Sequence, residues 1–170
     1  MNEPDLGPLP GWTETPLPPD RKNNSFVSGR PDGDVLRVRY YLDQATGQRV
    51  ARAWFGPGAE GPPGMAHGGS LAAVLDEAMG NNCWIQGYKV LAGTLTIRYR
   101  QSLPLGSTAV VRTRIERVDG RKVHTWGGVF APDGALCTEA EGIFIQLTAE
   151  QQAAFAEAAS RHDYTMPDAY

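Results

Sequence analysis

Apolar residues follow a helical spacing in the middle of this chain and a β-type pattern on either side of it. Residues 66–86 form the only long helical candidate of that region, and Gly87 is suited to end the helix. The positions that define the apolar face are Leu71, Val74, Leu75, Ala78 and Met79. The sequence therefore predicts one long helix over residues 66–86.

Six β-prone runs flank this helix, two before it and four after it. Asp119-Gly120 predicts a tight hairpin, and Pro132-Asp133-Gly134 predicts a second turn, so the later runs form an antiparallel meander. One helix cannot cover both faces of such a sheet, but it can fill the concave face of a curved one. We therefore expect an α+β fold, in which a curved antiparallel sheet of about six strands wraps around one long central helix. The expected strands cover residues 35–42, 49–55, 90–100, 108–118, 122–131 and 135–147.

The two ends of the chain differ from the region of residues 31–147, which is interpreted as one domain. Residues 1–30 are interpreted as an irregular arm on the surface or on a partner subunit, because six of the thirteen prolines precede residue 25. A capping-box pattern beginning at Thr148 predicts a final helix. Residues 148–170 are therefore expected to form an appended helix and tail.

Composition excludes several classes of function. The net charge of −3 gives no overall attraction to nucleic acid or to an anionic membrane. The two cysteines, Cys83 and Cys137, are too few for a disulfide scaffold and are interpreted as buried free thiols. No secretory signal or membrane-spanning run is recognisable, which predicts a cytoplasmic protein. The histidines lack metal-ligand spacing, so we expect neither a metal nor a cofactor.

The start of the predicted helix is the first candidate for chemistry. His67, Gly68 and Gly69 stand where a proline-stiffened loop enters the helix. The first N–H groups of a helix lack intrahelical partners and carry the positive end of its dipole, so they can stabilise an oxyanion. Glycines there allow another molecule to approach the backbone. The alternative interpretation is a tight turn that needs two glycines for structural reasons.

Asp76 is the second candidate, because it lies among small residues on one side of the helix. The alternative is an ordinary solvated carboxylate, while the adjacent Glu77 is interpreted as structural or supporting. Gly68 and Asp76 are about 12 Å apart along one helix, too far to reach the same carbonyl group. Two antiparallel copies of the helix would bring Gly68 of one chain to Asp76 of the other, which predicts a symmetric dimer.

Several segments together resemble the hotdog-fold acyl-CoA thioesterases, the branch that contains the phenylacetate-pathway enzymes and the thioesterase superfamily members. They are Gly61-Pro-Pro-Gly-x-Ala-His-Gly-Gly followed by Asp76, Ile97-Arg98-Tyr99-Arg100-x-x-Leu-Pro104, and Val118-Asp119-Gly120-Arg121-Lys122, within residues 53–147. The resemblance implies hydrolysis of an acyl-CoA thioester to free acid and CoA.

The resemblance also implies a role for single residues. Asp76 would be the nucleophile or general base, the Gly68 N–H the oxyanion donor, and His67 a support of the loop or a contact to the thioester. Thr94 would be the hydroxyl residue that positions water or the carboxylate. Some relatives place that hydroxyl two residues earlier, where this chain has Ala92, and others carry an amide side chain where this chain has Gly61.

The substrate-binding candidates are Gly69 and Gly61 near the helix start, and Arg121 and Lys122 after the Asp-Gly hairpin as a basic pair for the CoA phosphates. A solvated charged hairpin is the competing interpretation of that pair. The expected partners are an acyl-CoA substrate and further copies of the chain, as a homodimer or a homotetramer. Two alternatives remain for the function: an acyl-CoA binding protein without turnover, and a hotdog enoyl-thioester hydratase.

Overall fold

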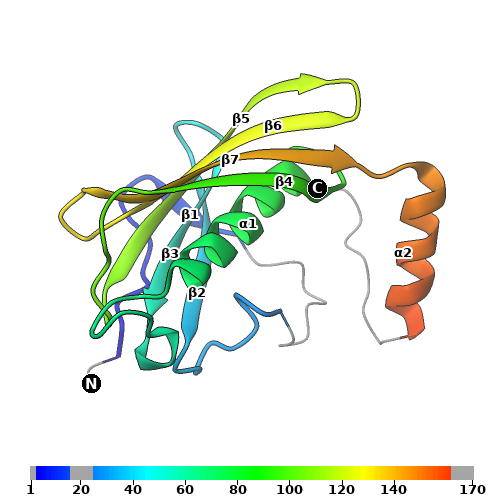
Figure 1. Cartoon of the computed structure of the whole chain (residues 1–170). Helices are drawn as coiled ribbons and strands as arrows, with labels where there is room; N and C mark the ends of the chain where they lie inside the picture. Colours follow the sequence, from blue (N-terminus) through cyan, green and yellow to red (C-terminus); the bar gives the residue numbers. More distant parts are fainter. Residues whose placement is uncertain (1–2, 16–24, 162–170) are drawn as a thin grey trace.

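The computed structural model describes residues 3–15 and 25–161, the side chains of the last three excepted. Seven antiparallel strands form one sheet in the order β1-β2-β3-β5-β6-β7-β4, and the helix α1 lies along its concave side (Figure 1). The predicted fold class is therefore confirmed. The elements are β1 (Trp12–Glu14), β2 (Leu36–Asp43), β3 (Arg49–Phe55), the short 3-10 helix η1 (Pro57–Ala59), α1 (Gly68–Ile85), β4 (Val90–Tyr99), β5 (Thr108–Asp119), β6 (Lys122–Phe130), β7 (Leu136–Gln146) and α2 (Ala149–Arg161).

The contact between α1 and the sheet depends on glycines in the strands. Met79 of α1 is completely buried. A Cβ atom at Gly127 of β6 would lie 2.9 Å from its Cγ and Sδ atoms, and one at Gly142 of β7 would lie 2.7 Å from its Cε atom. Because larger residues would collide there, the glycines let the helix sit close to the sheet. Burial of a side chain such as Met79 contributes about 1.5–3 kcal/mol.

The seventh strand lies in the arm that the sequence predicted to be irregular. Trp12 to Glu14, a stretch without proline, pair with β2 from Asp43 to Tyr41. The Trp12 ring lies 5.8 Å from the Tyr41 ring, which fixes this short strand at the margin of the sheet. The rest of the proposed arm includes residues 16–24, which lie outside the described residues.

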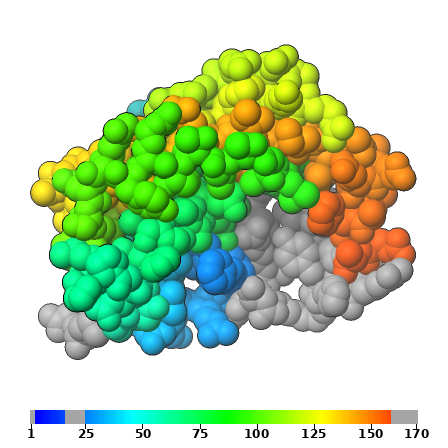
Figure 2. Space-filling view, in the orientation of Figure 1, coloured from blue at the N-terminus to red at the C-terminus, as the bar shows by residue number. Residues whose placement is uncertain are grey.

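β4 forms the opposite margin of the sheet. Among the described residues it pairs with β7 alone, so its other side presents unpaired backbone groups. Leu91 and Tyr99 are 49% and 56% exposed. The green band of β4 is open to view in Figure 2. A ten-residue strand with exposed apolar side chains is a surface on which another strand can add.

Two further predictions can be compared with the structure. Cys83 and Cys137 are buried free cysteines, as expected, and burial raises the pKa of Cys83 to about 12. The final helix is α2, and its start carries the predicted cap, because Thr148 Oγ1 accepts a hydrogen bond from Gln151 N at 3.2 Å. Of the helices in the described ranges, none is long and apolar enough to cross a membrane.

Candidate active site

The loop before α1 is closely folded against the helix start. Gly61 N donates to Met65 O at 2.9 Å, and His67 N donates to Ala59 O at 2.7 Å. A Cβ atom at Gly61 would lie 2.8 Å from the Cα atom of His67, so a larger residue would push the loop away. Gly61 therefore has a structural reason to be glycine, in addition to its predicted place in substrate binding.

The hydrogen bonds of the first helical turn distinguish Gly68 from its neighbours. His67 is the N-cap residue, and its Nδ1 atom accepts from Gly69 N at 2.9 Å. Its carbonyl oxygen accepts from Ser70 N at 2.9 Å and from Leu71 N at 3.4 Å. Gly68 is the first residue of the helix, so its N–H has no intrahelical acceptor. Of the first four N–H groups, that of Gly68 is the one best placed to meet a ligand oxygen, whereas that of Gly69 already serves the cap.

Tyr99, the last residue of β4, contacts Gly68 at the start of α1. Its hydroxyl group donates to Gly68 O at 3.0 Å. A Cβ atom at Gly68 would lie 3.1 Å from the Tyr99 ring. This tyrosine was part of a recognised sequence motif, but its role could not be read from the sequence.

Asp76 lies two turns further along α1 and is half-buried. Burial raises its pKa above the ordinary value, and the negative charge of Glu77 raises the pKa further. A carboxylate with a raised pKa in a partly buried position is typical of a general base or nucleophile. Its distance from Gly68 along the helix axis, eight residues, is about 12 Å.

The sheet register places Thr94 on the side of β4 that faces away from α1. Thr94 pairs with Ile143, whereas its neighbour Ala92 pairs with the core residue Phe144. Gly93 is an extra residue at this point, where the register shifts. Because alternate residues of a strand face opposite sides, Ala92 points to the helix side and Thr94 does not. Within one chain, the structure therefore does not bring Thr94 and Asp76 together.

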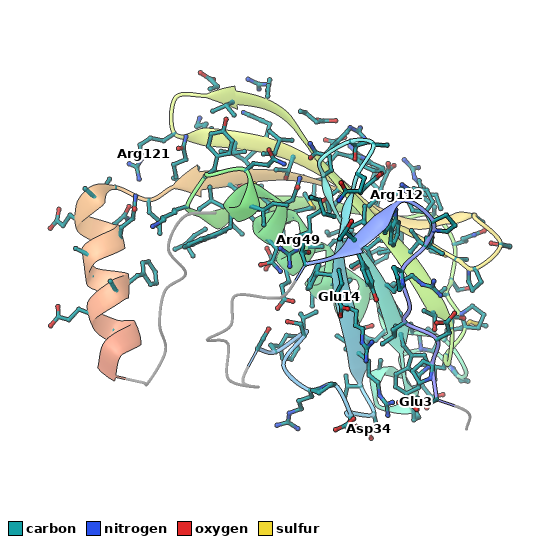
Figure 3. All side chains as sticks on the ribbon, turned by 180° about the vertical axis from the view of Figure 1, so that it is seen from behind. Glu3, Glu14, Asp34, Arg49, Arg112 and Arg121 are labelled. Atoms are coloured by element: carbon teal, nitrogen blue, oxygen red, sulfur yellow. The ribbon has the colours of Figure 1, made fainter. Side chains whose placement is uncertain are left out.

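Arg121 and Lys122 lie at the other end of the sheet from Gly68. Arg121 Nε and Nη2 donate to Gln146 O at 3.0 and 2.8 Å, and Gln146 pairs with Val90, the first residue of β4. Figure 3 shows Arg121 beside α2 at this end of the molecule. Val90 and Tyr99 are nine positions apart along the extended strand, which is about 30 Å. Arg121 thus links the β5–β6 hairpin to β7 by hydrogen bonds. Neither basic residue reaches the Gly68 of its own chain.

The structure thus gathers part of the predicted site and separates the rest. Gly61, His67, Gly68 and Gly69 lie together at the start of α1, Asp76 lies two turns away, and the basic pair lies at the opposite end. Within the described ranges, no group of three His, Cys, Asp or Glu side chains could hold a metal ion.

Residues 63–138 match a family model described as Thioesterase superfamily. Three curated relatives are acyl-coenzyme A thioesterases. THEM4 of Xenopus laevis is 30% identical, over 77% of this chain and 61% of its own length. THEM4 of Bos taurus is 33% identical, over 74% of this chain and 52% of its own length. THEM5 of Mus musculus is 34% identical, over 57% of this chain and 40% of its own length. The chain therefore spans about half the length of these relatives.

Several solved structures have a similar fold, and one of them is a thioesterase superfamily protein. The thioesterase superfamily protein RHA08564 is 29% identical, with a TM-score of 0.61 over 65% of this chain and 54% of that chain. BH2602 of Bacillus halodurans, solved with CoA, is 26% identical, with a TM-score of 0.55 over 61% and 70%. The E. coli PaaI protein of the phenylacetic acid degradation operon is 16% identical, with a TM-score of 0.60 over 65% and 80%. The fold and the helix with its glycine-rich start define a hotdog domain. With these relatives, the chain contains a hotdog domain similar to those of the thioesterase superfamily, which confirms the resemblance inferred from its sequence.

Proposed function

We propose that this protein hydrolyses acyl-CoA thioesters to free acid and CoA, and that each active site is built from two chains. The observation that carries the proposal is the pair of groups on α1: an N–H at Gly68 that has no intrahelical acceptor, and a half-buried carboxylate at Asp76. The N–H can stabilise the oxyanion that forms when the thioester carbonyl is attacked. The carboxylate can activate water or attack the carbonyl itself. The acyl-CoA thioesterase names of the curated relatives and the CoA bound by BH2602 support the choice of substrate.

A dimer across the β4 margin explains how the two groups could meet. α1 begins beside Tyr99 and ends beside Val90, because Tyr99 bonds to Gly68 and Trp84 Nε1 donates to Val90 O at 3.2 Å. Two β4 strands related by a two-fold axis pair antiparallel. The two α1 helices then also run antiparallel, so the N-terminal half of each can face Asp76 of the other. Unpaired backbone groups and exposed apolar residues on β4 support this arrangement.

The same arrangement gives the basic pair a place in substrate binding. In the antiparallel dimer, the Val90 end of one β4 approaches the Tyr99 end of the other. Arg121 and Lys122 of one chain would then lie near the Gly68 of its partner, where the phosphates of CoA could extend. The approximately 30 Å between these groups within one chain favours this shared site over a site within one subunit.

Release of free thiol from a panel of acyl-CoAs, measured for the wild type and Asp76→Asn, tests the proposal. Thiol release by the wild type and its loss in the variant are expected. Tight acyl-CoA binding without thiol release would instead identify a binding protein. Loss of enoyl absorbance without thiol release would identify a hydratase. Sedimentation equilibrium of the same preparations measures the oligomeric state, and a monomer with full activity would overturn the shared site.

A further inference from the structure

Glu77, the residue after Asp76, is fixed by two hydroxyl groups from outside α1. Tyr40 of β2 donates its hydroxyl hydrogen bond to Glu77 Oε1 at 2.9 Å. Ser25, in the segment before β2, donates to Glu77 Oε2. Both bonds are long-range contacts, across 37 and 52 residues of sequence. The two donors therefore hold the Glu77 carboxylate in a fixed position, on the residue next to Asp76 in the helix.

The environment of Tyr40 keeps that donor in place. Tyr40 is only 3% exposed. Burial, followed by the charge of Glu77, raises the pKa of Tyr40 well above its ordinary value, so the hydroxyl group keeps its proton. Behind it, the guanidinium of Arg49 from β3 lies 5.0 Å from the centre of the Tyr40 ring. The segment of Ser25 is fixed as well, since Val27 is 5% exposed and belongs to the core.

We infer that Glu77 is a positioning residue, whose fixed negative charge makes the neighbouring Asp76 a stronger base. This inference rests on the proposed function, in which Asp76 is the catalytic carboxylate. Successive residues of a helix point about 100° apart, so Glu77 faces β2 and Ser25 while Asp76 faces another side. Glu77 therefore acts on Asp76 through its field and does not touch the substrate.

The electrostatic surroundings agree with this role. Tyr40 from β2 and Arg49 from β3 are titratable or charged groups on the side of Glu77, and Ser25 adds a neutral hydroxyl. Tyr40 contacts both charged groups. Its ring lies against the Arg49 guanidinium, and its hydroxyl group donates to the Glu77 carboxylate. The charge of Glu77 contributes to the raised pKa of Asp76, after burial. A stronger base accepts a proton from water more readily in the transition state.

The decisive variant is Glu77→Gln, which keeps the shape of the side chain and removes its charge. We expect the acidic limb of the pH profile of kcat/KM to move to lower pH by about half a unit to one unit. Turnover near neutral pH should fall by roughly two- to threefold, because the weaker base is a poorer proton acceptor. A carbon-13 titration of the Asp76 carboxyl group, assigned with Asp76→Asn, should show the same shift without any dependence on turnover.

Ser25→Ala is the matched control. It removes one hydrogen bond to Glu77 but leaves the charge, so it should lower the thermal midpoint slightly and leave the acidic limb within about 0.2 units of wild type. If Glu77→Gln folds and neither the acidic limb nor the carboxyl titration moves, Glu77 is only structural and the inference is wrong. Failure of the proposed function looks different, because the wild type itself would then release no thiol. If Glu77→Gln does not fold, Glu77→Asp takes its place. This variant retains the charge, so the acidic limb of its pH profile should match that of wild type. A shifted acidic limb would overturn the inference.

Discussion

The hydroxyl group of Tyr99 donates a hydrogen bond to the carbonyl oxygen of Gly68 at 3.0 Å. This bond joins the end of the exposed strand β4 to the first residue of α1. One hydrogen bond therefore links the proposed dimer contact to the residue that carries the proposed oxyanion donor. A change in how β4 pairs would be transmitted to the position of the Gly68 N–H.

Tyr99→Phe should impair catalysis while leaving the fold intact. The variant keeps the ring that lies against Gly68 and loses only the hydrogen bond. Loss of such a bond costs about 0.5–1.5 kcal/mol, which corresponds to roughly a two- to tenfold fall in kcat if Gly68 shifts in the transition state. Steady-state kinetics measure the effect, and a change in KM alone would show that Tyr99 supports binding instead.

Asp76→Asn should remove hydrolysis and stabilise the protein. Turnover should fall by about 10²- to 10⁴-fold, because the amide is neither a base nor a nucleophile. Since the pKa of Asp76 is raised in the folded state, its ionisation costs stability as the pH rises through that pKa. The thermal midpoint of the variant should therefore exceed that of wild type at neutral pH, and the gain should vanish below the ordinary pKa of aspartate. A variant less stable than wild type at neutral pH would contradict this explanation.

Mixing two inactive variants tests whether the site is shared. Gly68→Val places branched carbons against the Tyr99 ring, which would lie only 3.1 Å from the first of them, the Cβ atom, while Asp76→Asn removes the carboxylate. In a mixed dimer one site carries both defects and the other carries neither. With random exchange, about half the dimers are mixed, so roughly a quarter of wild-type activity should return. A tag-based pull-down confirms exchange, and confirmed mixed dimers without activity would count against the shared site.

Lys122→Gln should weaken the binding of CoA esters without affecting the chemical step. Loss of one exposed contact to phosphate corresponds to about 0.2–1 kcal/mol, or roughly a 1.4- to fivefold rise in KM with kcat unchanged. Lys122 is the better probe of this pair, because Arg121 also binds Gln146 O. An acyl N-acetylcysteamine thioester, which lacks phosphates, serves as the control substrate. An equal rise in KM for both substrates would exclude a phosphate contact.

Thr94→Ala should leave kcat within about twofold of wild type, because the exposed side chain points away from α1 and its loss removes no described contact to Asp76. This expectation differs from the role that the family resemblance implied. A large fall in kcat with unchanged KM would restore the water-positioning role and require β4 to rearrange in the dimer.

The sequence predicted the main elements because their patterns are local. Apolar residues at helical spacing indicated α1, and the predicted range 66–86 differs from the observed Gly68–Ile85 by only one or two residues at each end. The Asp119-Gly120 turn joins β5 and β6, with Asp119 opposite Lys122 and Gly120 at a φ of 54°. Short-range signals of this kind do not depend on how the strands later assemble.

Relationships between distant segments could not be predicted in the same way. Tyr40 and Ser25 reach Glu77 only because the sheet brings β2 and the preceding segment beside α1. The side of the sheet to which the Thr94 side chain points depends on the extra residue at Gly93. A regular alternation of side chains between the two faces of a strand does not predict such a residue. A glycine inside a strand is itself a sign of a bulge, so Gly93 was the one available signal.

The cap at the start of α1 also determines which form of the His67 ring is present. Nδ1 accepts the hydrogen bond from Gly69, so the neutral imidazole carries its proton on Nε2. In this tautomer the ring has a donor left to offer and no second acceptor. Any ligand group that meets Nε2 must therefore be an acceptor such as a carbonyl oxygen. In the proposed mechanism, His67 is then a polarising neighbour of the substrate, and proton abstraction is left to a carboxylate.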